Sequence, residues 1–117
     1  MDIQPVVRGH MLVVPRTHAA YLADLDPEDG AAVFRSGQLA AAAVRASSLR
    51  CEGVNLVLAD GEAAGQELFH VHLHVIPRYQ GDGFGLRLPP DYSIRPRAEV
   101  DEAAAALRAE WWPAGAG

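Results

Sequence analysis

The stretch His70-Val71-His72-Leu73-His74-Val75-Ile76 places three histidines at alternate positions among apolar residues. Side chains alternate between the two faces of a β-strand, so this spacing predicts that the three imidazoles project from one face. The intervening apolar residues then face the other way and form part of the core. We expect a strand over residues 69–76, ended by Pro77, with its histidine face toward solvent or a cleft.

Three explanations of the histidine row remain open at this point. The row could be a solvated or hydrogen-bonded face without a function. It could bind a metal, but His70 and His74 lie ~13 Å apart along a strand that rises about 3.3 Å per residue. Zinc–nitrogen bonds of about 2.1 Å cannot easily gather all three rings, so further ligands would come from His10, His18 or an acidic residue.

The third explanation is catalysis at phosphorus. A neutral imidazole is a good nucleophile, and neighbouring imidazoles can donate hydrogen bonds to phosphate oxygens and to a leaving group. The glycine-containing loop from Gly61 to Gln66 leads directly into the histidine row. Glycine lets backbone N–H groups approach an anion closely, and the Gln66 amide is a neutral donor. Together these features favour a phosphate site.

The rest of the chain predicts an α+β fold. A helix is expected from Asp26-Pro27 to about Leu49, because an aspartate cap precedes a proline suited to the first turn. Small and apolar residues at helical spacing give this helix a smooth face, which would let it lie close to a sheet: Val33, Gly37, Ala40 and Val44. The remaining expected elements are strands over 11–14 and 54–58, an irregular segment over 79–97 and a second helix over 98–111. The short connection between residues 58 and 69 requires antiparallel strands.

Composition excludes several classes of protein. The 117 residues suit one domain, and the net charge of −5 argues against a binder of nucleic-acid polymers. No apolar stretch reaches the ~20 residues that a membrane span needs. The single cysteine, Cys51, cannot form an intrachain disulfide, so we expect a cytoplasmic location.

The histidine row resembles the signature of the histidine triad (HIT) family, in which three histidines alternate with apolar residues. The segment Gly9-His10-Met11-Leu12-Val13-Val14-Pro15-Arg16-Thr17-His18 is similar to the family's Gly-His-x-Leu-Val-Ile-Pro-Lys-x-His. Gly65-Gln66 looks like its Ala-Gly-Gln element, and Asp2-Ile3 matches a pair that contacts the nucleoside. Pro77-Arg78 and Gly81-Asp82-Gly83-Phe84 look like its bacterial branch.

The resemblance implies an antiparallel sheet of about five strands packed against one long helix plus a C-terminal helix, usually in a homodimer. It also implies catalytic roles for four histidines. His72 would attack the α-phosphorus and form a nucleotidyl-histidine intermediate. His74 would bind the phosphate, His70 would orient the site, and His10 would complete the hydrogen-bond network.

The resemblance further implies the residues that bind substrate. Asp2 and Ile3 would contact the ribose and base, whereas Gly65 and Gln66 would hold the phosphate beside His72 and His74. Glu67 would lie near the leaving group, at a position where the phosphoramidase branch has a serine. An ionised carboxylate accepts hydrogen bonds but donates none, so this substitution affects the assignment as a phosphoramidase.

Other departures concern the chain's start and its metal content. We interpret residues 1–117 as a single HIT domain that lacks the usual N-terminal segment, and we expect the native chain to begin upstream. Ala59 replaces a polar residue that many members direct toward the sugar or phosphate. The N-terminal Cys-x-x-Cys of zinc-binding members is absent, so we predict no structural zinc. His18 is expected to be structural.

These observations predict a nucleotide hydrolase without a cofactor or metal. It would cleave at the α-phosphate of AMP or GMP derivatives, namely nucleoside phosphoramidates or dinucleoside polyphosphates. A nucleotidyl transferase is the first alternative, although the family's transferases carry glutamine at the position of His74. A non-catalytic AMP-binding or interaction protein is the second, and a metal-binding protein is the third.

Overall fold

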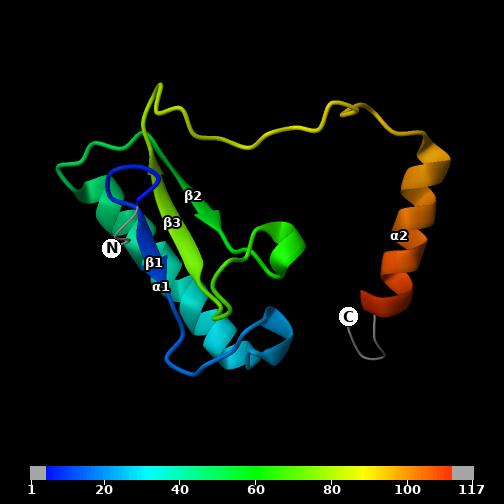
Figure 1. Cartoon of the computed structure of the whole chain (residues 1–117), viewed down its shortest axis with the longest axis horizontal. Helices are drawn as coiled ribbons and strands as arrows, with labels where there is room; N and C mark the ends of the chain where they lie inside the picture. Colours follow the sequence, from blue (N-terminus) through cyan, green and yellow to red (C-terminus); the bar gives the residue numbers. More distant parts are fainter. Residues whose placement is uncertain (1–4, 112–117) are drawn as a thin grey trace. The chain divides into compact units, whose positions relative to one another are not determined.

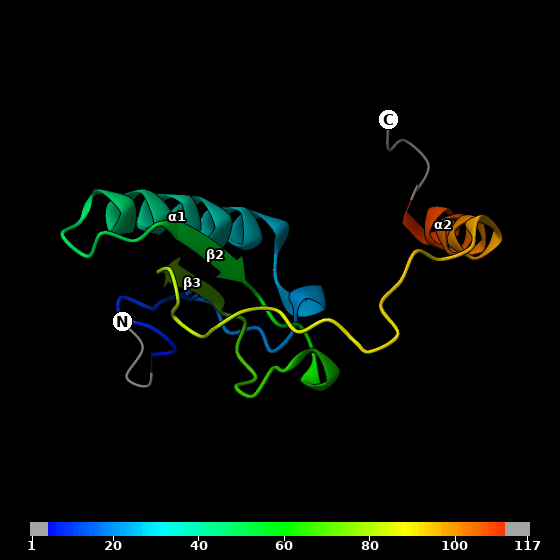
Figure 2. The same ribbon diagram turned by 90° about the horizontal axis from the view of Figure 1, so that it is seen from above.

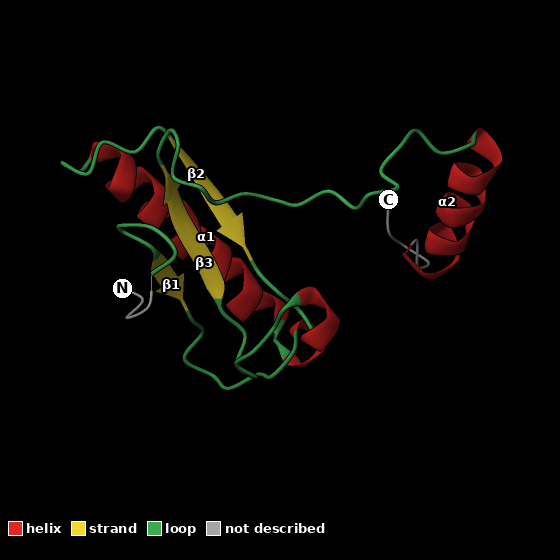
Figure 3. Cartoon of the chain, turned by 45° about the horizontal axis from the view of Figure 1, so that its top comes forward, coloured by secondary structure: helices red, strands yellow, loops and turns green. Residues whose placement is uncertain are grey.

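The computed structural model describes residues 5–111, so the predicted nucleoside contacts Asp2 and Ile3 lie outside the described residues. The chain divides into two compact units, Met1–Phe84 and Gly85–Gly117. The first unit contains a sheet of three short strands and a long helix (Figure 1). The second contains one helix, α2 (Arg97–Trp111), preceded by a segment without helix or strand (Figure 3).

The sheet is antiparallel throughout. Its strands are β1 (Met11–Val13), β2 (Gly53–Val57) and β3 (Leu73–Arg78), in the order β1-β3-β2. On the central strand, His74 lies between Leu12 of β1 and Val57 of β2. Short 3-10 turns over Leu22–Asp24 and Glu62–Ala64 occur in the connections.

Helix α1 (Pro27–Ala46) covers one face of the sheet, as Figure 2 shows. The Asp26 side chain accepts a hydrogen bond from the Glu28 N–H at 2.8 Å, and Pro27 occupies the first turn, as the sequence predicted. A Cβ atom at Gly37 would lie 2.7 Å from Leu73 Cδ2, so any larger residue there requires the Leu73 side chain to shift or α1 to move away from β3. The expectation of a smooth helix face against the sheet is confirmed.

Two element boundaries differ from the prediction. Helix α1 ends at Ala46 rather than near Leu49, because the Ser47 hydroxyl and N–H both bond to the Val44 carbonyl. Strand β3 covers Leu73–Arg78 rather than 69–76. Pro77 does not end it, because β1 reaches only Val75 and leaves Pro77 at an edge position, where proline is tolerated.

The predicted α+β class is confirmed, whereas the described residues form three strands rather than about five. The number five came from the family resemblance, and the sequence itself contained only three strand-like stretches. The buried residues Val71, Leu73 and Val75 belong to the core, as predicted. Within residues 5–111, no helix is both long and apolar enough to cross a membrane.

Candidate functional site

Three histidines form a compact cluster beside the paired strands β1 and β3. His10 precedes β1 and is 1% exposed, His74 lies in β3, and His72 precedes β3 and is 9% exposed. The His10 Nε2 and His74 Nδ1 atoms lie 2.8 Å apart. The rings of His72 and His74 meet edge to face, with centroids 4.8 Å apart. The predicted association of these three residues is therefore present in the structure.

A backbone N–H assigns the protons in the His10–His74 pair. The Val6 N–H donates to His10 Nδ1 at 3.1 Å, so this nitrogen accepts and the ring proton lies on Nε2. His10 Nε2 consequently donates to His74 Nδ1. The neutral His74 ring then carries its proton on Nε2.

A backbone carbonyl assigns the proton of His72. Its Nδ1 lies 2.8 Å from the His70 carbonyl oxygen, which can only accept, so the Nδ1–H donates. The neutral His72 ring therefore has its lone pair on Nε2. A ring in this tautomer can act as a nucleophile through Nε2 while the carbonyl holds its orientation.

His70 and His72 both precede β3, and the His70 ring has its own hydrogen-bond partners outside the histidine cluster. Its Nε2 lies 3.1 Å from the Pro15 carbonyl oxygen, and its Nδ1 lies 3.1 Å from Nδ1 of His18. The predicted strand over 69–76 is wrong for His70 and His72, since only His74 of the three histidines lies in a strand. The His70 side chain is held by the segment over residues 15–20 instead.

The loop before the histidines is organised by Gln66, which is 3% exposed. Its amide N–H groups donate to the carbonyls of Ala20 at 2.7 Å and Leu68 at 3.1 Å, and its oxygen accepts from the Gly61 N–H at 2.8 Å. Gly65 has a φ of 93°, and its N–H donates to the Glu62 carbonyl. In this structure both residues shape the loop.

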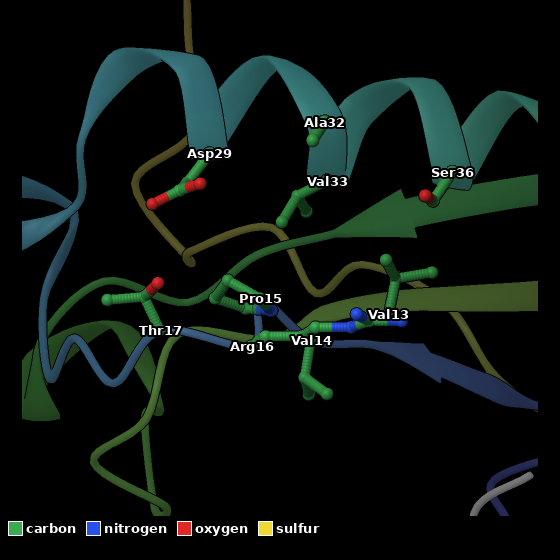
Figure 4. Close-up of a pocket in the computed structure, with 9 residues that line it drawn as sticks. All are labelled: Val13, Val14, Pro15, Arg16, Thr17, Asp29, Ala32, Val33 and Ser36. Carbon is green, nitrogen blue, oxygen red and sulfur yellow. The ribbon is translucent and has the colours of Figure 1, made fainter.

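Two of the cavities in the described part of the first unit lie by the glycine-containing loop and by the end of β1, outside the histidine cluster. One, of about 460 Å³, is lined by residues of the loop: Glu62, Gly65, Gln66, Glu67 and Phe69. The other, of about 270 Å³, lies between α1 and the end of β1, and Figure 4 shows its lining, which includes Pro15, Thr17 and Asp29. None of the clustered histidines lines either cavity. Glu67 lines the loop cavity together with Gly65 and Gln66.

Among residues 5–111, no three His, Cys, Asp or Glu side chains are placed to hold one ion.

Comparison with known proteins assigns the family. The model of the HIT domain matches residues 1–81. The chain belongs to the HIT, or histidine triad, family. It is 43% identical over 97 residues to an uncharacterized HIT-like protein of Mycobacterium tuberculosis, a match that covers 78% of this chain and 67% of that protein.

A zinc-bound histidine triad protein from Mycobacterium smegmatis has a similar structure. The TM-score is 0.69 at 43% identity, over 93% of this chain and 73% of that one. The bis(5'-adenosyl)-triphosphatase of Saccharomyces cerevisiae is 34% identical over 86 residues, which are 73% of this chain and 41% of the yeast enzyme. These relatives support an α+β HIT fold and, broadly, a role in binding or hydrolysing nucleotides.

The sequence prediction missed the partners that hold His70. Pro15 and His18 both lie in the upstream segment that resembles the family. The alternation of a strand gave no reason to pair them with His70 in particular.

Proposed function

We propose that this HIT protein hydrolyses nucleotides at the α-phosphate through a nucleotidyl intermediate on His72. The supporting observation is the hydrogen bond of 2.8 Å from His72 Nδ1 to the His70 carbonyl, which leaves the lone pair on Nε2. The substrates proposed are nucleoside phosphoramidates and dinucleoside polyphosphates built on AMP or GMP.

The first step forms a bond between His72 Nε2 and the α-phosphorus. The bond from phosphorus to the leaving nitrogen or oxygen breaks, and the leaving group takes its electron pair and a proton from the solvent. The His72 ring becomes positively charged, and the His70 carbonyl stabilises this charge through the Nδ1–H. Water then attacks phosphorus, the phosphorus–nitrogen bond breaks, and the nucleoside monophosphate leaves together with a proton.

His74 is proposed as the donor to the phosphate. Because His10 donates to its Nδ1, the neutral His74 ring has its proton on Nε2, next to the edge of the His72 ring. This arrangement lets one proton-bearing ring stabilise the negative charge that develops as phosphorus is attacked. His10 supports the reaction by fixing the tautomer of His74, and His70 supports it through its carbonyl.

The substrate-binding residues remain part of the proposal. Asp2 and Ile3 are proposed to contact the ribose and base, and Gly65 and Gln66 to hold the phosphate. A Gln66 amide that donates to phosphate must first release the Ala20 or Leu68 carbonyl. Glu67, in the loop cavity, is proposed to face the leaving group and to favour amines over polyphosphates.

We also propose that residues 1–117 act as one functional domain in a cytoplasmic homodimer. The matched family model ends at residue 81, so the segment beyond it belongs to the proposal. Sedimentation of the purified chain gives its oligomeric state.

Initial rates with adenosine phosphoramidate and with diadenosine polyphosphates test the function. We expect the wild type to turn over one or both classes and His72→Ala to lose on the order of 10⁴-fold or more in kcat, with AMP binding retained. A wild type that binds AMP without any turnover contradicts the proposal and favours a non-catalytic nucleotide-binding protein.

A further inference from the structure

The rings of His18 and His70 form a second pair beside the nucleophile. Their Nδ1 atoms lie 3.1 Å apart, and the ring centroids are 5.1 Å apart at an interplanar angle of 55°. The direction of this hydrogen bond follows from the far side of His70. Its Nε2 lies 3.1 Å from the Pro15 carbonyl oxygen and must donate there, so in the neutral ring Nδ1 accepts from His18 Nδ1–H.

The peptide group between His70 and Val71 is held on both of its edges. Its carbonyl accepts from His72 Nδ1–H at 2.8 Å, and its N–H, that of Val71, donates to the Ala19 carbonyl at 2.7 Å. The residue next to Ala19 is His18. The same short segment therefore fixes both the side chain of His70 and the peptide that orients His72.

We propose that His18 is a positioning residue for His72 and acts through His70. The donor on His18 keeps His70 Nδ1 unprotonated and its Nε2–H on Pro15, which locks the His70 side chain. A locked His70 holds its carbonyl at the position that keeps the His72 proton on Nδ1. The inference rests on the proposed function of His72 and adds a role for a residue outside the triad.

Two substitutions at residue 18 separate the hydrogen bond from the shape of the ring. His18→Phe keeps a ring of similar size and removes the donor. His18→Asn keeps an N–H donor close to the position of the histidine Nδ1. Thr17→Val is the matched control, because Thr17 lines the cavity under α1 (Figure 4).

The readouts are the rate of adenylyl adduct formation from adenosine phosphoramidate, the KM, and the ¹⁵N chemical shifts of the His72 ring. We expect His18→Phe to slow adduct formation by about 10- to 100-fold with little change in KM, since misorientation of a reacting group carries a cost of this size. Its ¹⁵N shifts should report a mixture of His72 tautomers. His18→Asn and Thr17→Val should retain the wild-type rate and the single Nδ1–H form.

Equal rates and equal ¹⁵N shifts for His18→Phe and wild type overturn the inference. Equal losses in His18→Phe and His18→Asn also overturn it, because they indicate a structural role of the imidazole. If the wild type forms no adduct, the proposed function fails by itself. The ¹⁵N shifts of His72 in the same variants then still decide whether His18 positions that ring.

Discussion

Backbone groups set the proton positions on the rings of His10, His72 and His70. The Val6 N–H makes His10 Nδ1 an acceptor, the His70 carbonyl makes His72 Nδ1 a donor, and the Pro15 carbonyl makes His70 Nε2 a donor. Backbone groups cannot change their donor or acceptor character with pH. The neutral tautomer of each ring is therefore a property of the fold.

The buried amide of Gln66 gives a prediction at the same scale. In Gln66→Glu, a carboxylate oxygen replaces the amide nitrogen that donates to the carbonyls of Ala20 and Leu68. An ionised carboxylate cannot donate, so both hydrogen bonds are lost. We expect a loss of about 3 kcal/mol in the free energy of unfolding at neutral pH, measured by urea denaturation. Glu67→Gln, the reverse change at the exposed neighbouring residue, is the control and should cost less than about 0.5 kcal/mol. Equal stabilities of the two variants would show that the Gln66 bonds contribute little.

The residue types in the cluster were predictable, whereas their partners were not. The spacing of the triad and the upstream His10 identified which side chains meet. The tautomers depend on the carbonyls of Pro15 and His70, which any residue type supplies. The contact of His18 with His70 depends on how residues 15–20 run beside residues 70–71, and no local pattern encodes that path.

At the scale of elements, the approach of α1 to β3 depends on Gly37. A Cβ atom there would lie 2.7 Å from Leu73 Cδ2, whereas one at Gly30 would lie 3.8 Å from its nearest neighbour, Leu25 Cδ2. We expect Gly37→Val to lower the free energy of unfolding by about 1–3 kcal/mol through overpacking. Gly30→Val changes helix propensity equally and should shift stability by less than about 0.5 kcal/mol. Matching urea curves for the two variants would contradict this account of the packing.

The ion pair between Arg78 and Asp82 stabilises the turn after β3. Arg78 donates to both carboxylate oxygens of Asp82, at 2.8 and 2.7 Å, and to Asn55 Oδ1 of β2 at 2.7 Å. The Asp82 carboxylate also accepts from the N–H groups of Tyr79 and Phe84. The hydrogen bonds from Arg78 are the largest cause that holds the pKa of Asp82 well below its usual range. The hydrogen bonds from the N–H groups of Tyr79 and Phe84 are the next largest causes.

This lowered pKa predicts a pH dependence of stability. The folded-state pKa lies below the unfolded value near 4, so the ionised Asp82 stabilises the fold above about pH 4. That contribution is lost progressively as the pH falls below 4 toward the folded pKa. We expect Asp82→Asn to lower the urea midpoint at pH 7 and to flatten its dependence between pH 5 and pH 2.

Asp101→Asn provides the control for this titration, because Asp101 pairs with Arg97 at an exposed position of α2. Its urea midpoint should follow the wild-type pH profile. An Asp82→Asn variant with the wild-type slope in acid would contradict the role of the ion pair.

The elements themselves were largely predictable, and their ends were not. Aspartate capping and Pro27 located the start of α1, because these residues act within one turn. The shift of β3 toward Arg78 depended on long-range contacts, since Val71 bonds to Ala19 before the strand begins. The Arg78–Asp82 pair was part of a motif in the sequence, but its connection to Asn55 required the register of β2 and β3.

At the scale of the whole molecule, the chain forms two compact units joined after Phe84. The segment over 85–96 contains no helix or strand, and within it Leu86 is 96% exposed and Ile94 is 100% exposed. The sequence predicted an irregular segment here from its prolines and glycines. It gave no indication that the chain divides into two units after Phe84.

Limited proteolysis tests this division. Trypsin cleaves exposed, unstructured backbone first, and Arg87 lies in the irregular segment, whereas Arg78 is engaged with Asp82 in β3. We expect the first cut after Arg87, seen by intact mass as a fragment of residues 1–87. A first cut within residues 5–84 would contradict the expectation that the irregular segment over 85–96 is the most accessible backbone.

The central claim is that His72 carries the nucleotide during the reaction, and intact mass spectrometry tests it most directly. The wild type and His72→Ala are mixed with adenosine phosphoramidate and quenched in acid, and their intact masses are measured. The account predicts a mass increase of one adenylyl group on the wild type and none on His72→Ala. An adduct on both proteins would contradict the assignment of His72, and no adduct on the wild type, together with no turnover, would contradict the proposed covalent mechanism.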